Sequence, residues 1–260
     1  MHINLNSMIA ITRGVSPHIG HCELTHLQRN RIDVELAKIQ HQQYEKNLTE
    51  LGCILHQLPA EPNLPDSVFV EDTAVVLDEL AIITRPGADS RKPETTAVAE
   101  ALKSYRRLFF IEPPGQLDGG DVLVLKKFIY IGLSSRSNLN ALEQVTGIVK
   151  PYGYEVDGIE VEGCLHLKSA ITGVADNRVL INPAWLAKGL FKHMDVIEVH
   201  PSEPYAGNAL WIGKQVIYPS AFPRTLERLE QQGIRCRLVD VSELAKAEGA
   251  VTCCSLIFQR

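Results

Sequence analysis

The sequence lacks the features of proteins that bind nucleic acids or membranes. It holds 26 Lys and Arg against 31 Asp and Glu, a formal net charge of -5, and no basic run could follow a phosphate backbone. No apolar run approaches the roughly 18 residues that span a bilayer. The opening "MHINLNSMIAITRG" lacks the parts of a signal peptide. We therefore expect a cytoplasmic protein that binds neither nucleic acid nor membrane.

The cysteines are also too few, and wrongly spaced, for a disulfide scaffold or a structural zinc site. Six cysteines are spread over 260 residues, and no C-x-x-C pair occurs. We expect them to be reduced thiols. Two of them, Cys253 and Cys254, are adjacent in the apolar stretch "AVTCCSLIF", and this pair needs its own explanation.

What the sequence does contain is a repeated pattern of short apolar runs. Hydrophobic residues make up 45% of the chain, enough for a sizeable core. Pairs of runs rich in Val, Ile and Leu, each split by a polar turn, recur with a period of roughly 40 to 50 residues. The pairs are "TAVVLDELAIITRPG" from 73, "DVLVLKKFIYIGLSS" from 121, "SAITGVADNRVLINPAW" from 169 and "NALWIGKQVIYPSAF" from 208. Each pair predicts a hairpin of two strands.

Helical patterns separate these hairpins, and the two ends of the chain complete a fifth unit. The helical stretches are "RIDVELAKIQHQQYEKNL", "PETTAVAEALKSY", "NLNALEQVTGIV" and "PRTLERLEQQG". The C-terminal "AVTCCSLIF" lacks a partner strand, which the N-terminal "MIAITRGVSP" can supply. The pattern predicts a propeller-like ring of five units, closed by pairing of the terminal strands. The simpler alternative is the ordinary alternation of strands and helices in an α/β protein.

In such a ring, the residues at the starts of the first strands converge on one mouth. Those segments are "FVED" (69–72), "LDGGD" (117–121), "LHLKS" (165–169), "AGNA" (206–209) and "VTCC" (251–254). They contain carboxylates, a histidine, a lysine, an asparagine and cysteines. Several of these residue types carry acid-base and nucleophilic chemistry.

The mouth holds the parts of a thiol-based site. A thiol nucleophile needs a proton partner, and of nine histidines only His166 lies at such a strand start; the alternative is a core histidine. Glu71 and Asp72 are adjacent, so in a regular strand only one of them would face the site. Asp118 precedes a glycine pair, which would let the backbone turn sharply or approach another segment closely.

Arginines follow the second strands at equivalent places in three units. Arg13, Arg85 and Arg136 hold these places, where a guanidinium can grip a carboxylate through two bonds; a solvated arginine is an equally ordinary alternative. Carboxylates, arginines, a histidine and a cysteine together describe a site for a zwitterion with a second positive group. That ligand is an amino acid with a basic side chain.

The motifs "LPDSVFVED", "AIITRPGA", "LDGGDVL", "LHLKS" and "GAVTCCS" resemble those of the dimethylarginine dimethylaminohydrolases, within the guanidine-modifying (pentein) superfamily. The resemblance runs in order from residue 24 to 258. It implies a five-fold pseudosymmetric α/β propeller of ββαβ-like modules, with residues 1–260 as one catalytic domain. It also implies hydrolysis of dimethylarginine or monomethylarginine to citrulline and the methylamine, through a covalent cysteine S-alkylthiouronium intermediate, without cofactor or metal.

The resemblance also implies a role for each matching position. Cys253 would be the nucleophile, His166 the general acid and base, and Asp118 the residue that orients the imidazole. Cys254 would have no chemical role, because alternation along a strand turns it to the other side. The substrate guanidinium would meet Asp72 and Glu71, its α-amino group Asp66 and the carbonyls of Leu24 and Ala247, and its α-carboxylate Arg85 and Arg136.

Other functions stay open at this point. Arginine deiminases and amidinotransferases resemble longer chains, whereas a hydrolase of arginine or of another substituted guanidine fits this length. A non-catalytic ring protein, like a ribosome-binding translation initiation factor of the same architecture, is an alternative of another class. Zinc held by Cys253 and His166 would act as an inhibitor. Besides the small-molecule substrate, a second copy is a candidate partner, because closed rings often pair through an outer helix or edge.

Overall fold

The computed structural model describes residues 8–186, 189–191 and 193–260, so half of the segment searched for a signal peptide lies outside it. Within these ranges fifteen strands form five three-stranded sheets. The sheets, in strand order, are β15 (Leu256–Gln259), β1 (Met8–Arg13) and β2 (Ile54–Leu58); β3 (Ala74–Val76), β4 (Leu80–Ile83) and β5 (Arg107–Phe110); β6 (Val122–Leu125), β7 (Phe128–Leu133) and β8 (Glu155–Glu160); β9 (Ile171–Ala175), β10 (Arg178–Ile181) and β11 (Asp195–Glu198); and β12 (Leu210–Ile212), β13 (Gln215–Pro219) and β14 (Cys236–Val239). The expected five units are confirmed.

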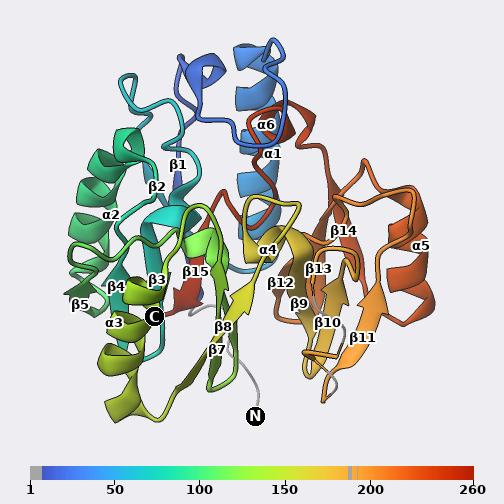
Figure 1. Cartoon of the computed structure of the whole chain (residues 1–260). Coiled ribbons are helices and arrows are strands. Elements are labelled where there is room, and N and C mark those ends of the chain that lie inside the picture. The colour runs from blue at the N-terminus through green and yellow to red at the C-terminus, as the bar shows by residue number, and fades with distance from the viewer. Residues whose placement is uncertain (1–7, 187–188, 192) are drawn as a thin grey trace.

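Each sheet has the same topology. The first two strands are antiparallel and the third runs parallel to the second. A parallel pair needs a crossover connection. In four sheets the crossover contains a helix, namely α1 (Val34–Glu50), α2 (Thr95–Leu102), α3 (Leu139–Val149) or α5 (Pro223–Gln231). Figure 1 shows α2 and α3 on one side of the molecule and α5 on the other, with β3 and β15 near the centre.

Local sequence explains where these helices begin. The Asp33 carboxylate accepts from the backbone N–H groups of Glu35 and Leu36, and the Asn138 amide oxygen accepts from Ala141 N–H. Both are N-caps, which satisfy N–H groups that the first turn leaves without partners. Pro223 begins α5, where a missing N–H costs nothing. In the described residues between β10 and β11 no helix forms.

The terminal strands close the ring as expected. Strand β1 pairs antiparallel with β15, with Ile9 opposite Phe258 and Ile11 opposite Leu256. Apolar clusters fill the space between neighbouring sheets: one cluster joins residues of β3–β4 to residues of β6–β7, so neither sheet buries its apolar face alone. No helix among the described residues combines the length and the apolarity that crossing a membrane requires.

The segments at the mouth differ from the expected strands. Val70–Thr73 (η3) and Gly119–Asp121 (η5) are short 3-10 helices, and Leu167–Ala170 (α4) is one helical turn. The cysteine pair lies in a turn before β15. The prediction that Cys253 and Cys254 belong to a strand is therefore wrong. These turns set side-chain directions that strand alternation cannot give.

Phe258 provides a test of ring closure. Its side chain is 5% exposed, and its ring meets that of Tyr105 edge-on at a centroid distance of 5.3 Å. Phe258→Ala should lower the free energy of unfolding by about 3–5 kcal/mol, because the cavity adds to the lost burial. Urea denaturation measures this. Phe110→Ala, at a half-exposed phenylalanine of β5, is the matched control, and equal losses would contradict the packing described.

Candidate active site

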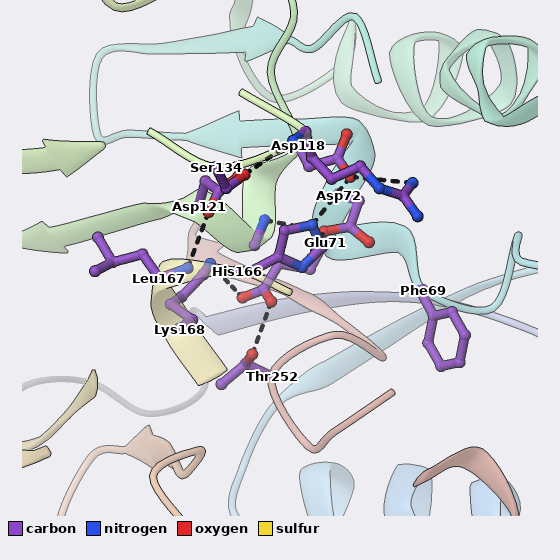
Figure 2. Close-up of polar contacts among 12 residues, drawn as sticks. Phe69, Glu71, Asp72, Asp118, Asp121, Ser134, His166, Leu167, Lys168 and Thr252 are labelled. Carbon is purple, nitrogen blue, oxygen red and sulfur yellow. Dashed lines mark hydrogen bonds and ion pairs between the residues drawn. The ribbon is translucent and has the colours of Figure 1, made fainter. Parts of the chain in front are cut away.

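His166 lies at the mouth of the ring, directly before α4. Its Nε2 is 3.0 Å from Asp118 Oδ2, and its Nδ1 is 3.9 Å from Asp72 Oδ1 (Figure 2). Burial alone would lower the pKa of His166, but the negative charges of Asp72, Asp121 and Asp118 raise this pKa to about 9. At neutral pH the ring is therefore a cation. Since Nε2 is bound to Asp118, Nδ1 is the nitrogen left for proton transfer.

The glycine pair after Asp118 lets the segments meet. A Cβ on Gly120 would lie 2.5 Å from His166 Nδ1, and one on Gly119 would lie 1.9 Å from the carbonyl oxygen of Glu71. Neither position can hold a side chain. The Gly120 N–H donates to Asp72 Oδ1 at 2.9 Å. The expected close backbone approach is therefore observed, and it occurs against the histidine and the carboxylate.

Asp72 is held by an arginine that the sequence patterns did not identify. Arg91 Nη1 lies 2.6 Å from Asp72 Oδ2, and both side chains are buried. Arg91 also pairs with Glu94 at 2.9 Å and donates to the carbonyl of Phe69. Burial would raise the pKa of Asp72, but the charges of His166 and Arg91 lower this pKa to about 2. Asp72 is therefore an anion at neutral pH.

Glu71 points to a different cavity from Asp72. Its carboxylate pairs with Lys168 and accepts from Thr252 Oγ1 at 2.7 Å. It lines a central cavity of about 520 Å³, whereas Asp72 lines the small cavity beside His166. The two side chains do separate, but through the 3-10 turn of η3 rather than through the strand alternation that we expected.

The two cysteines also separate. Cys254 is fully buried in the apolar core, whereas the half-buried Cys253 lines the cavity that contains His166. The Glu71 N–H donates to the Cys253 carbonyl at 3.1 Å. Burial, followed by the charges of Glu71 and Asp72, raises the pKa of the Cys253 thiol to about 12. At neutral pH this thiol is protonated.

The cavity beside His166 has a volume of only about 20 Å³. Six of the ten expected site residues line it, namely Asp66, Asp72, Arg136, His166, Ala247 and Cys253. The Asp66 carboxylate accepts from Glu23 N–H at 3.1 Å, and Arg136 Nη2 donates to Thr25 Oγ1 at 2.9 Å. The segment around residue 24 therefore forms one wall.

The other four expected residues do not line this cavity. Asp118 lies behind it, with its Oδ2 at 3.0 Å from His166 Nε2 and 3.9 Å from Arg136 Nη1, and Glu71 faces the central cavity. Leu24 packs against the apolar core, next to Glu23, which does line the cavity. Arg85 donates to the carbonyl of Gly115 at 3.1 Å. That the substrate α-carboxylate meets both Arg85 and Arg136 stays a prediction.

Glu248 fixes the segment around residue 24 that forms one side of the cavity, and no sequence signal pointed to it. Its carboxylate accepts from three consecutive backbone N–H groups, those of Thr25 at 2.9 Å and of His26 and Leu27 at 2.6 Å. Its φ is +59°, which is uncommon for a residue with a side chain. Glu248 also lines the cavity, so it ties the segment 25–27 over the site.

Among the described residues, Asp72, Asp118 and His166 are brought together closely enough to share a cation, with ligand atoms within 4.8 Å of one another. Asp72 already binds Arg91, and Asp118 Oδ1 accepts from Gly87 N–H at 2.8 Å. This cluster differs from the pair of Cys253 and His166 considered for inhibitory zinc. Its carboxylates serve the histidine and arginine cations.

Comparisons with known proteins identify the family of this chain. The family profile described as N,N dimethylarginine dimethylhydrolase, eukaryotic, matches residues 23–257. The N(G),N(G)-dimethylarginine dimethylaminohydrolase of Pseudomonas aeruginosa is 35% identical over 237 residues, which cover 90% of this chain and 93% of the relative. The enzyme of the same name from Streptomyces coelicolor is 36% identical over 249 residues, or 95% of each chain.

A solved structure gives the same result in three dimensions. The Pseudomonas aeruginosa enzyme, as a cysteine-to-serine mutant complexed with citrulline, superposes with a TM-score of 0.92 at 33% identity. The superposition covers 96% of this chain and 98% of that one. With the sequence match over residues 23–257, these similarities show that the chain belongs to the dimethylarginine dimethylaminohydrolase family.

Proposed function

We propose that the protein hydrolyses dimethylarginine and monomethylarginine to citrulline and the corresponding methylamine. One observation carries the proposal: a cysteine thiol, a histidine cation bound to Asp118 and the ionised Asp72 surround the same cavity. The names of the relatives and the citrulline in the solved Pseudomonas structure support the same substrate class.

Charge complementarity supports how the substrate would bind. The Asp72 anion would attract the guanidinium, with Glu71 behind it. Asp66 and the carbonyls of Leu24 and Ala247 would receive the α-amino group, and Arg136 would receive the α-carboxylate. Arg85 would have to leave the Gly115 carbonyl to join Arg136.

The cavity must open before a ligand can enter. Its volume of about 20 Å³ has room for about one water molecule, which is far less than an arginine derivative needs. Glu248 holds the wall through the segment 25–27. Release of those three hydrogen bonds would uncover the site.

The protonation states support a sequence of proton transfers. The bound guanidinium lowers the pKa of the Cys253 thiol, because a nearby positive charge favours the thiolate. His166 is already protonated at neutral pH, so the thiol proton passes to solvent. The thiolate attacks the guanidinium carbon, and the carbon–nitrogen bond to the methylamine breaks as His166 protonates the leaving nitrogen. An S-alkylthiouronium results.

Hydrolysis then restores the thiol. The neutral His166 takes a proton from a water molecule, which attacks the same carbon. The carbon–sulfur bond breaks as the remaining proton of the attacking water passes to the sulfur, which restores the thiol, and citrulline is released. Asp118 holds the ring in one orientation through both steps, as its bond to Nε2 indicates.

Arginine and other substituted guanidines are the second group of candidate substrates, since the residues described fit any guanidinium. A panel of dimethylarginine, monomethylarginine and arginine with product identification separates them. Citrulline release from none of the three substrates would favour the non-catalytic ring protein.

Several expectations from the sequence stay predictions. They are the single-domain organisation, the cytoplasmic location, a homodimer, and the lack of nucleic-acid, membrane, cofactor and metal partners.

The cysteine pair gives the most direct test. Cys253→Ser should abolish citrulline formation, because a serine hydroxyl is a far weaker nucleophile than a thiolate. Cys254→Ala, at the buried neighbour, should keep kcat within about threefold while lowering stability by ~1–2 kcal/mol. A colorimetric citrulline assay and thermal unfolding measure the two effects. The reverse pattern would exchange the two assignments.

Arg136 lines the cavity beside His166 and Arg85 does not, so we expect their substitutions to raise KM by different amounts. Arg136→Ala should raise KM about 10- to 100-fold with a smaller change in kcat, since a charge-assisted hydrogen bond contributes ~1.5–3 kcal/mol. Arg85→Ala should raise KM less, because Arg85 must first leave Gly115. Steady-state kinetics with dimethylarginine measure both. A larger effect from Arg85 would show that the arginines rearrange when substrate binds.

The raised thiol pKa predicts slow alkylation of the free protein. With the pKa of Cys253 at about 12, the thiolate fraction at pH 7 is minute and grows about tenfold per pH unit below that pKa. Iodoacetamide labelling of Cys253, followed by peptide mass spectrometry, should rise accordingly between pH 7 and 10. Rapid labelling at pH 7 without ligand would contradict the protonated resting state.

A further inference from the structure

We propose that Asn208 is a positioning residue that fixes the nucleophile segment relative to the acid-base segment. The inference deepens the proposed function and rests on it. Asn208 comes from "AGNA", one of the five segments at the mouth. It precedes β12, and its side chain is buried, with 4% exposure.

The Asn208 amide joins the two segments directly. Its Nδ2 donates to Thr252 Oγ1 at 3.0 Å and to the carbonyl of Lys168 at 3.0 Å. Its Oδ1 accepts from Thr252 N–H at 3.1 Å. Thr252 immediately precedes Cys253, and Lys168 follows His166 by two residues. One side chain therefore bridges the backbones next to both reacting groups.

Only an amide satisfies these three partners. Two hydrogens of the NH₂ group meet two oxygens, and the amide oxygen meets an N–H group. The reversed orientation would set Oδ1 against the Lys168 carbonyl oxygen and Nδ2 against the Thr252 N–H. An aspartate keeps the accepted bond but loses both donated ones. The partners thus fix both the residue type and its rotamer.

The backbone of Asn208 is itself fixed against the histidine segment. A Cβ on Gly207 would lie 2.8 Å from the carbonyl oxygen of Ser169, so the chains are in direct contact there. Thr172 Oγ1 donates to the Gly207 carbonyl at 2.8 Å and accepts from Ala209 N–H at 3.1 Å. Movement of the turn 251–254 relative to His166 is therefore resisted by the Asn208 amide.

Glu71 also bridges Lys168 and Thr252, but only through their side chains. Glu71 is a carboxylate beside the proposed guanidinium site, so its removal would change charge as well as geometry. Asn208 is neutral and lies outside the lining of the small cavity. Its removal therefore isolates the effect of position.

The decisive experiment compares Asn208→Ala with the wild-type protein in two assays. With dimethylarginine, kcat should fall about 10- to 100-fold while KM changes less than about threefold, because a displacement of about 1 Å at the reacting atoms costs up to 10²-fold. Without substrate, iodoacetamide labelling of Cys253 at pH 8 should become about threefold faster, which is half a pKa unit. A loosened turn admits water and relieves the burial that raises the thiol pKa.

Asn182→Ala is the matched control. Asn182 is also buried, with 3% exposure, and its amide likewise bridges backbone groups: Nδ2 donates to the Pro204 carbonyl at 2.8 Å and Oδ1 accepts from Ala184 N–H at 2.9 Å. It should lose similar stability, yet keep kcat and the labelling rate within about twofold. Equal kinetic losses in the two variants would overturn the proposal.

Two further measurements apply if Asn208→Ala does not fold or if the wild-type protein is inactive. If Asn208→Ala does not fold, the isosteric Asn208→Asp replaces it, and an unchanged kcat in that variant would overturn the proposal. If the wild-type protein releases no citrulline, the proposed function fails. The substrate-free labelling of Cys253 still tests Asn208 in that case, and equal rates in wild type and variant would reject its positioning role.

Discussion

The pairing of charges that are removed from water is the constraint on which the site depends. A buried carboxylate or imidazolium is unstable unless an opposite charge lies beside it. Asp72 stays ionised because His166 and Arg91 flank it, and His166 stays protonated because Asp72, Asp121 and Asp118 surround it. Each of these partners therefore shifts the pKa of the group beside it. Gly120, in the glycine pair after Asp118, makes this pairing sterically feasible. A side chain at Gly120 would collide with both the Asp72 carboxylate and the His166 imidazole.

The ring supplies these groups from separate modules. Asp72, Asp118, His166, Asn208 and Cys253 come from the segments before β3, β6, β9, β12 and β15 respectively. Distances among them are therefore set by how the five sheets pack, and not by the local chain. Single contacts between modules, such as those of the Asn208 amide with Lys168 and Thr252, therefore bear directly on the distance between the reacting groups.

Much of this arrangement could be predicted from sequence. Alternating apolar runs located the hairpins, and the similarity of "MIAITRG" to "LAIITRPG" indicated that the terminal strands pair. Periodicity could not show that the mouth segments are turns. "FVED" (69–72) is expected to begin a strand, yet Val70–Thr73 form a 3-10 turn in which Glu71 and Asp72 reach different partners. Apolar periodicity does not report such tertiary hydrogen bonds.

The buried charged residues were the hardest to predict. Arg91 lies in "DSRKPE", whose charges suggest a solvated surface, but its guanidinium is buried against Asp72 and Glu94. Glu248 stands in "AEGA" with nothing to indicate its contact with residues 25–27, which are more than 200 positions away. Such contacts depend on the packing of distant segments, so they become visible only in three dimensions.

The protonated resting state of Cys253 would affect how fast oxidants attack this thiol. Peroxides oxidise thiolates, and a cysteine whose pKa is about 12 offers almost none at neutral pH. The resting protein would therefore withstand oxidants that inactivate cysteines of low pKa. In the proposed reaction a bound guanidinium ionises this thiol, so its sensitivity to oxidants would follow the occupancy of the site and not the abundance of the protein.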